Sequence, residues 1–258
     1  MKKEILVTTR FEDYAQKYEN IRMERRGGVL QLTFHTGGDS LVWNEVTHRE
    51  LGYAFSDVGA DPENRVVIIT GAGDDFCTQI VADDWDLTAP RKWDKVYWEG
   101  KRLIQNLLDI EVPIIAAVNG PCTIHSELAV LSDIVLCSDT AYFQDAAHFA
   151  TFNAVPGDGV HVIWPLLLGP NRGRYFLLTG QKLSAEEAKD LGVVAEVLPR
   201  QRLLARAWEL AEQMAQKPIL ALRYTRVALT MRLKRLMLEG TGYGLALEGH
   251  GLVDFSCP

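Results

Sequence analysis

Two continuous apolar runs constrain the fold of this chain more than any other feature of its sequence. NRVVIITGAG spans residues 64–73 and ends in a glycine turn, and VPIIAAVNG spans residues 112–120. A strand that is apolar at successive positions is buried on both faces, which is typical of a parallel sheet covered by helices. Residues 29–36 (VLQLTFHT) alternate in polarity and are rich in β-formers, so they predict a further strand.

The segments between these strands have helical character. Residues 46–58 and 93–108 carry apolar side chains at helical spacing. A turn and a short helix precede a strand predicted over residues 133–144. Later segments are a helix that stops at Gly180, a helix capped by Ser184 with Glu187 three residues on, and a short strand.

The two ends of the chain are expected to differ. The first twenty residues are polar and mixed, and we expect a loose arm there. After Pro199 the pattern is helical, with a break at Pro218, as far as about Glu239. Strands that alternate with helices, followed by a helical tail, predict an α/β fold, either as one large domain or as a domain with an appendage.

Composition excludes several classes of function. The chain has 258 residues, 47% of them hydrophobic, and a net charge of −7, which argues against a nucleic-acid surface. It has no apolar run of membrane-spanning length and no signal-peptide pattern, so we expect a cytoplasmic protein that does not enter a membrane. Its four cysteines form no C-x-x-C pair, which disfavours a structural metal. Neither G-x-G-x-x-G nor a P-loop is present, so nicotinamide and nucleotide cofactors are disfavoured.

One turn is unusual. NGPCTIHSELAVLSDIVL (residues 119–136) places Ile124 and His125 where a turn meets a helix. The backbone is crowded at such a point, and small residues are expected there.

These segments, in this order, resemble the crotonase (enoyl-CoA hydratase/isomerase) superfamily. The supporting pieces include NRVVIITGAGDDFC, VPIIAAVNGPCTIHSELAVLSDIVL and KPILALR. The resemblance implies a β/β/α spiral core over residues 1–199 and a helical region over residues 200–258 that packs into trimers. It also implies an oxyanion hole made by backbone N–H groups. Acyl-CoA members have a glycine pair where this chain has Ile124 and His125, whereas Glu127 is retained, so the helix opening is altered for CoA.

A closer resemblance is to the β-diketone hydrolase branch, which includes 6-oxocamphor hydrolase. It rests on SLVWNEVTHREL, FQDAAHF, VPGDG and NRGRYFLLTGQ. The functional positions of that branch fall on Trp43, His48, His125, His148, Asp158 and Glu248.

The resemblance implies that these residues cleave a carbon–carbon bond in a small β-diketone with neither cofactor nor metal. His148, oriented by Asp158, is the expected base for water, with an apparent pKa of about 6–7. Trp43 and His125 are the expected N–H donors to carbonyl oxygen. His48 is a candidate proton donor or carbonyl contact, and Glu248 either orients His48 or returns the proton to carbon.

Structural roles are the alternatives for each position. Asp158 also suits a helix cap, and Trp43 suits core packing. Trp85, Phe152 and Trp98 either line an apolar pocket or belong to the core, and Trp85 is taken as a substrate-binding candidate.

Three functions from different classes stay open at this point. The first is a β-diketone hydrolase that forms a homotrimer or a dimer of trimers. The second is an acyl-CoA hydratase or isomerase with an altered glycine turn. The third is a non-enzymatic scaffold or RNA binder that uses the basic residues 231–236 (MRLKRL). The joint presence of three histidines, a tryptophan and an aspartate at the expected positions favours the first.

Overall fold

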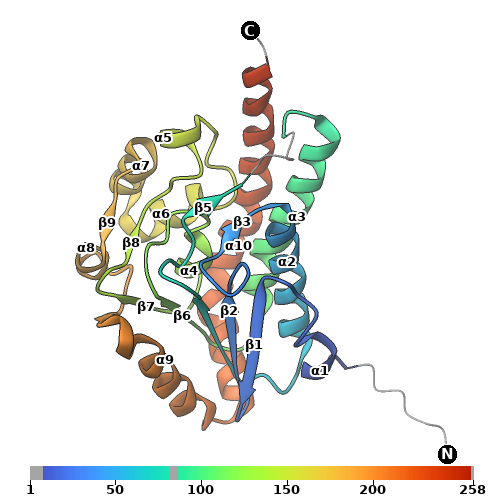
Figure 1. Ribbon diagram of the computed structural model, residues 1–258, viewed down its shortest axis with the longest axis vertical. Coiled ribbons are helices and arrows are strands. Elements are labelled where there is room, and N and C mark those ends of the chain that lie inside the picture. The colour runs from blue at the N-terminus through green and yellow to red at the C-terminus, as the bar shows by residue number, and fades with distance from the viewer. Residues whose placement is uncertain (1–7, 82–86, 257–258) are drawn as a thin grey trace, which may run out of the picture.

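A six-stranded sheet forms the centre of the computed structural model, which describes residues 8–81 and 87–256 (Figure 1). The strand order is β1-β2-β4-β6-β7-β10. The strands are β1 (Ile21–Arg26), β2 (Val29–Phe34), β4 (Val66–Gly71), β6 (Ile114–Val118), β7 (Ile134–Ser138) and β10 (Glu196–Leu198). Within this six-stranded sheet of the described residues, β1–β2 is the one antiparallel pair, so the predicted parallel α/β sheet is confirmed.

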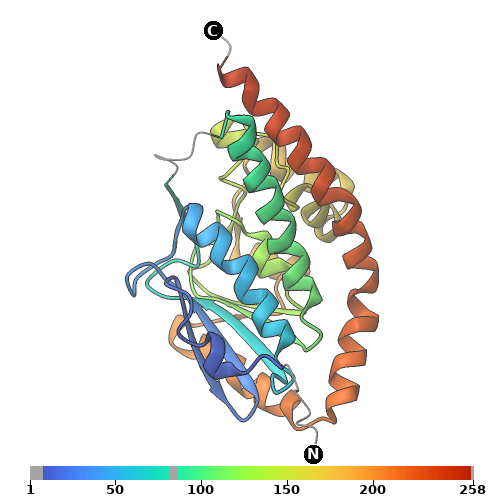
Figure 2. The same ribbon diagram turned by 90° about the vertical axis from the view of Figure 1, so that its right-hand side faces the viewer.

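Helices cover both faces of this sheet. Helix α9 (Arg200–Ala215) packs Leu203 and its alanines against one face. The opposite face packs against α2 (Glu45–Ala60) and α3 (Pro90–Asp109). Figure 2 shows α2, α3 and the long helix α10 (Ile219–Leu252) side by side. Apolar side chains occupy both faces of β4 and β6, which explains why their sequences show no alternation.

Short elements extend from the carboxyl ends of the parallel strands. Strand β3 (Val42–Trp43) pairs with β5 (Gln79–Ile80), and β8 (Tyr142–Phe143) pairs with β9 (Leu183–Ser184). The helices of this region are α4 (Glu127–Val130), α5 (Phe149–Phe152), α6 (Val160–Leu168), α7 (Pro170–Thr179) and α8 (Ala185–Asp190). Gly180 ends α7 in the left-handed region, and Ser184 with Glu187 caps α8, as the sequence predicts.

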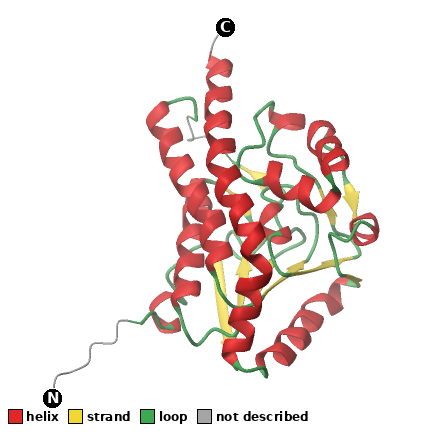
Figure 3. Cartoon of the chain, turned by 180° about the vertical axis from the view of Figure 1, so that it is seen from behind, coloured by secondary structure: helices red, strands yellow, loops and turns green. Residues whose placement is uncertain are grey.

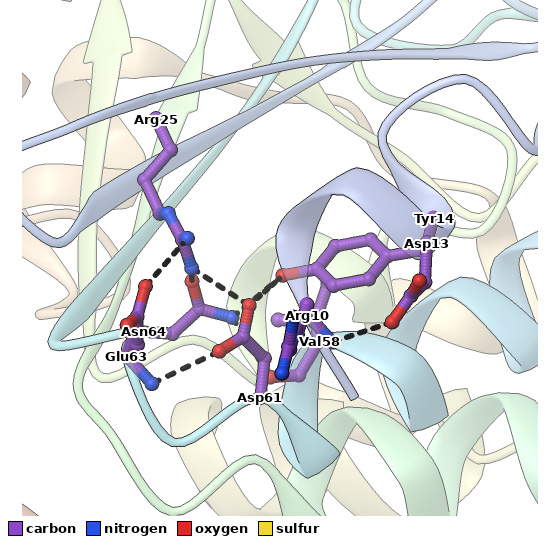
Figure 4. A network of polar contacts seen from close by, with 8 residues as sticks. All are labelled: Arg10, Asp13, Tyr14, Arg25, Val58, Asp61, Glu63 and Asn64. Carbon is purple, nitrogen blue, oxygen red and sulfur yellow. Dashed lines mark hydrogen bonds and ion pairs between the residues drawn. The ribbon is translucent and has the colours of Figure 1, made fainter. Parts of the chain in front are cut away.

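The first twenty residues are not the loose arm that was expected, as far as the structure describes them. Helix α1 (Phe11–Tyr14) buries Tyr14, whose hydroxyl donates to Asp61 at 2.9 Å. Arg25 forms an ion pair with the same carboxylate at 2.7 Å, and Asn64 donates to the Tyr14 hydroxyl (Figure 4). A buried carboxylate with several donors is well compensated, so this network fastens the segment to the core.

The segment predicted as one strand over residues 133–144 is two strands. Strand β7 ends at Ser138, and the carbonyl of Ser138 accepts a hydrogen bond from the N–H of Ala141. Asp139 and Thr140 lie in this turn and are exposed. The chain therefore changes direction before β8, and β8 runs in a different sheet.

Helix α10 continues well beyond the end predicted near Glu239. It runs through GTGYGLALEGHGL to Leu252 and spans much of the length of the molecule (Figure 3). Its glycines allow close packing: a Cβ on Gly244 would lie 2.3 Å from the His161 ring, and one on Gly249 would lie 1.9 Å from the Trp93 indole. Tertiary contact therefore overrides the low helix propensity of glycine here.

Among residues 8–81 and 87–256, no helix combines the length and the apolar character that crossing a membrane requires.

Candidate active site

A cavity of about 510 Å³ lies where the short elements meet α2, α3 and α10. Its wall includes six of the positions expected from the sequence: Trp43, His48, His125, His148, Asp158 and Glu248. The remainder is mostly apolar: Ile80, Leu87, Trp93, Val96, Ala147, Phe152, Ala154, Leu245 and Leu252. A largely apolar pocket with a few convergent polar groups is typical of a small-molecule site. Trp85, the other expected substrate contact, lies outside the described residues.

In the turn before α4, the side chains of Ile124 and His125 point to different surroundings. Ile124 is buried in the core, and its N–H donates to the carbonyl of Cys77 at 3.1 Å. His125 has a φ of 48°, in the left-handed region that favours glycine, while its side chain lines the cavity. A non-glycine residue in that region costs about 1–3 kcal/mol and persists where the surroundings fix it. The imidazole is therefore placed in the pocket at the cost of backbone strain.

Two carboxylates contact one nitrogen of His125. Nδ1 lies 2.6 Å from Oε1 of Glu127 and 3.2 Å from Oδ2 of Asp158. Burial disfavours the charged imidazole, but these carboxylates outweigh it and raise the pKa of His125. Burial and the charge of Asp158 in turn raise the pKa of Glu127 to about 6. The ring of His125 also packs on the indole of Trp43, with centroids 3.7 Å apart.

His148 is surrounded by three acidic side chains. Its Nδ1 lies 2.7 Å from Oδ1 of Asp145, and its Nε2 lies 3.5 Å from Oδ2 of Asp158 and 3.9 Å from Oε1 of Glu248. Burial lowers the pKa of His148, but the charges of Asp158, Asp145 and Glu248 raise it well above the usual histidine value.

Asp158 and Glu248 are tuned in opposite directions. Burial favours the neutral form of Asp158, yet the positive charges of His148 and His125 outweigh burial and lower the pKa of this carboxyl. Burial raises the pKa of Glu248 to about 8 in spite of the neighbouring His148. Asp158 also accepts from the N–H of Val160 at 3.4 Å, so it contacts the start of α6, whose N-cap is Gly159, and lines the pocket.

His48 contacts a glutamate that the sequence did not single out. Its Nδ1 lies 3.3 Å from Oε2 of Glu99, while Glu248, for which orienting His48 was one of two expected roles, lies near His148. Burial and the charge of His125 outweigh the carboxylate of Glu99, so the pKa of His48 is lowered. In this pocket the pKa of His48 is therefore lowered, which favours the neutral ring, and the pKa values of His125 and His148 are raised, which favours the charged ring.

Sequence reasoning missed Glu99 and Asp145 as site residues. Glu99 occupies the apolar face of α3 between Val96 and Leu103, and a charged residue on such a face was a detectable signal. Asp145 belongs to the FQDAAHF segment and stands three residues before His148. Of the aromatic candidates, Phe152 lines the pocket, whereas Trp98 is 41% exposed and lies near the ring of Tyr53.

A metal ion has one geometrically suitable place among the described residues. Ligand atoms of His125, Glu127 and Asp158 lie within 4.8 Å of one another, and all three residues are buried. The same atoms already form the short contacts described above, in which protons on histidine balance the carboxylate charges.

Comparisons with known proteins give two kinds of relative. Residues 24–242 match the enoyl-CoA hydratase/isomerase family. A curated relative, the carnitinyl-CoA dehydratase of Citrobacter koseri, is 33% identical over 209 residues, which cover 79% of this chain and 77% of that protein. An enoyl-CoA hydratase/isomerase structure from Mycobacterium paratuberculosis is 27% identical, with a TM-score of 0.84 over 91% of this chain and 94% of the other.

The second kind of relative is nearer. A β-diketone hydrolase from the cyanobacterium Anabaena sp. PCC 7120, solved with (S)-3-oxocyclohexyl acetic acid bound, is 54% identical to this chain. The two structures superpose with a TM-score of 0.93 over 95% of this chain and 98% of the other.

Proposed function

We propose that this chain, which belongs to the enoyl-CoA hydratase/isomerase family of the crotonase superfamily, hydrolyses a carbon–carbon bond in cyclic or bicyclic β-diketones. The observation that carries the proposal is one apolar pocket in which three histidines with differently shifted pKa values meet Asp158 and Glu248. Pairs of titratable groups whose pKa values are pushed apart divide the acid and base roles of a reaction. The 54% identity to a β-diketone hydrolase supports the same chemistry.

The reaction needs only water and the substrate. The oxygen of water bonds to one carbonyl carbon, one proton leaves to a base, and a tetrahedral oxyanion forms. The bond to the central carbon then breaks, and its electron pair becomes the enolate of the second carbonyl. A proton returns to that carbon, so the products are a carboxylic acid and a ketone in one keto acid.

The base role suits His148. In its neutral form it accepts the proton of water, and the resulting imidazolium lies between the carboxylates of Asp145 and Asp158. These charges favour the protonated product of the first step.

The oxyanion role suits His125. The carboxylates of Glu127 and Asp158 raise its pKa, which favours the imidazolium, the form that donates from both nitrogens. Nδ1 is taken by Glu127 and Asp158, which leaves Nε2–H for a developing oxyanion. The Trp43 indole beside it is the second candidate donor.

Glu248 suits the return of the proton. Because its pKa is raised to about 8, the carboxyl is largely protonated at neutral pH and has a proton to give. His48, held by Glu99, is neutral and is placed to contact the second carbonyl.

The pocket wall is less suited to a CoA thioester. None of its described residues is lysine or arginine, and the phosphates of CoA would find no cation there. Ile124 and His125 also occupy the helix opening where acyl-CoA relatives have glycines.

Turnover of a defined diketone tests the proposal. The substrate is the bicyclic 1,3-diketone whose ring opening gives 3-oxocyclohexyl acetic acid, and the readouts are loss of diketone absorbance and appearance of the keto acid. The parallel assay uses crotonyl-CoA. We expect diketone cleavage that is strongly reduced in His148→Ala and unchanged in His250→Ala, a substitution at an exposed position on α10. Turnover of the thioester without cleavage of the diketone would favour the acyl-CoA function.

A further inference from the structure

We propose that Asp145 is the residue that positions His148: its carboxylate binds Nδ1–H and so leaves the lone pair of Nε2 to accept a proton. The inference rests on the proposed function for the identity of that proton's donor, which is water. The orientation of His148 by Asp145 exists without substrate, so it does not depend on the proposed function.

The geometry separates the two aspartates by the nitrogen that each faces. Asp145 lies 2.7 Å from Nδ1, which is the distance of a strong charge-assisted hydrogen bond. Asp158 lies 3.5 Å from Nε2, on the other side of the ring. A neutral imidazole carries one proton, and the stronger acceptor decides which nitrogen holds it. The proton therefore belongs on Nδ1, toward Asp145.

Asp158 cannot supply this orientation from where it stands. A carboxylate at Nε2 favours a proton on Nε2, and a histidine in that tautomer has no lone pair there for water. Its position suits the later state instead, in which Nε2 has gained a proton and needs a negative neighbour. Asp145 and Asp158 thus act on one histidine at different stages.

The backbone fixes Asp145 for this task. Asp145 lies two residues after the end of β8, and the neighbouring Ala146 donates its N–H to the carbonyl of Thr123 at 2.9 Å. Gln144 donates to the carbonyl of Gly180 through its side chain. The segment is therefore tied to the turn that carries His125 and to the end of α7.

The carboxylate of Asp145 is also dedicated to His148. Asp145 is 3% exposed, and within the described part of the chain its Oδ2 has no hydrogen-bond partner. A buried carboxylate with one unpaired oxygen is costly unless a positive group lies beside it. The imidazolium of His148 is the positive group in contact with it.

Four ionisable groups face His148: Asp145 before α5, Asp158 before α6, Glu248 on α10 and His125 before α4. The three acids raise the pKa of His148, and His125 opposes them. Loss of one acid by substitution therefore lowers that pKa, whichever acid is removed. A pH profile of activity therefore detects the loss of any one of these acids. The tautomer of His148 shows which acid orients its ring.

The test measures the tautomer of His148 directly. Protein labelled with ¹⁵N in histidine is observed by NMR above the pH at which His148 loses its extra proton, and its signal is assigned by its absence in His148→Gln. The chain has six histidines, so the spectrum is tractable. We expect Nδ1–H in the wild type and in Asp158→Asn. We expect Nε2–H in Asp145→Asn, because the new amide donates to Nδ1.

Kinetics on the bicyclic diketone provide the second readout. Asp145→Asn should lower kcat on the order of 10²–10⁴-fold with little change in KM, since a histidine in the wrong tautomer binds substrate but does not accept the proton. The acidic limb of its kcat/KM profile should also move to lower pH. Asp139→Asn, at an exposed position in the turn after β7, is the matched control and should leave both values unchanged.

The outcomes separate this inference from the proposed function. Nε2–H in the wild type, or an unchanged tautomer in Asp145→Asn, would overturn the positioning role even if every diketone were cleaved. If Asp145→Asn does not fold, the wild-type tautomer alone decides. The expected tautomers without diketone cleavage would sustain the positioning role and reject the proposed function.

Discussion

His48 and His125 are buried in one pocket, and each contacts a glutamate through Nδ1, yet their pKa values shift in opposite directions. At His125 the carboxylates of Glu127 and Asp158, 2.6 and 3.2 Å from Nδ1, outweigh burial and raise the pKa. At His48 burial and the charge of His125 outweigh the carboxylate of Glu99, 3.3 Å from Nδ1, and lower the pKa. Small differences in distance and number of charges are enough to decide protonation where water is excluded.

Removal of the His125 side chain should impair the oxyanion step. We expect His125→Ala to lower kcat/KM by an amount equivalent to about 2–4 kcal/mol, the usual loss for one donor of an oxyanion hole. The fold should persist, because the residue lies in a turn and its backbone already adopts the left-handed region. Steady-state kinetics with thermal denaturation measure both effects, with His250→Ala as the control. A kcat/KM near that of the wild type would show that His125 does not stabilise the oxyanion.

The pH dependence should differ from the range of about 6–7 that the sequence suggested for an ordinary histidine. In the proposed base role His148 must be neutral, and the surrounding acids raise its pKa well above the usual histidine value of 6.5. Therefore kcat/KM should rise with pH through a value above 6.5, and this limb should be absent from the residual activity of His148→Ala. A rising limb centred below 6.5 would assign the base role to a group with an unshifted or lowered pKa, and His48 is the first candidate.

At the scale of elements, the sequence predicts what continuous patterns encode. The apolar runs of β4 and β6 and the helical spacing of α2 and α3 identify these elements, because burial on a sheet face imposes those periods. The end of α10 was not predictable in this way, since its glycines lower helix propensity and only contact with other elements reveals their role. Glu99 gives a local signal as a charged residue on the apolar face of α3, but its contact with the distant His48 is not encoded in any local pattern. Asp145 stands only three residues before His148, but the spacing alone does not show that the two side chains meet.

The glycines of α10 are expected to differ sharply in their tolerance of a methyl group. A Cβ on Gly244 would lie 2.4 Å from the carbonyl oxygen of Gly157, which is backbone and cannot turn aside. Gly244→Ala should therefore destabilise the protein by about 1–3 kcal/mol or more and displace Glu248 from the pocket. Chemical denaturation and diketone turnover measure the two effects.

Gly242→Ala is the matched substitution in the same helix. Its nearest neighbours, the Lys101 side chain and the Tyr97 hydroxyl, lie at 3.5 Å, an ordinary contact distance. Alanine should stabilise the helix there by about 0.5–1 kcal/mol relative to glycine. Equal effects of the two substitutions would contradict the close packing of this helix.

At the scale of the whole molecule, the helical region after Pro199 has two kinds of apolar residue. Leu203 and Leu222 are buried in the described chain, whereas Leu204 and Leu220 are exposed, and Leu229 is 75% exposed. Further exposed apolar side chains on α10 are Tyr224, Val227, Met231, Leu238, Tyr243 and Leu247. Such an accumulation on one helix indicates a surface that another subunit covers.

We therefore expect a homotrimer or a dimer of trimers. Sedimentation analysis at micromolar concentration measures the assembly, and Leu229→Asp should weaken it because a charge at a buried subunit contact is unfavourable. Asp190→Asn, an exposed change on α8, serves as a control. A wild-type protein that sediments as a monomer would exclude the trimer.

Because α10 is the last long element of the chain, it also determines when the pocket is completed during synthesis. The sheet and most of the pocket wall are translated first, and Leu245, Glu248 and Leu252 emerge from the ribosome after every other described residue of the cavity. A nascent chain that already holds its histidines in place still has a cavity open to water on that side, where charged groups are screened and the shifted pKa values relax. The proposed chemistry therefore requires a chain that has been translated past Glu248 and whose final turns of α10 are in place.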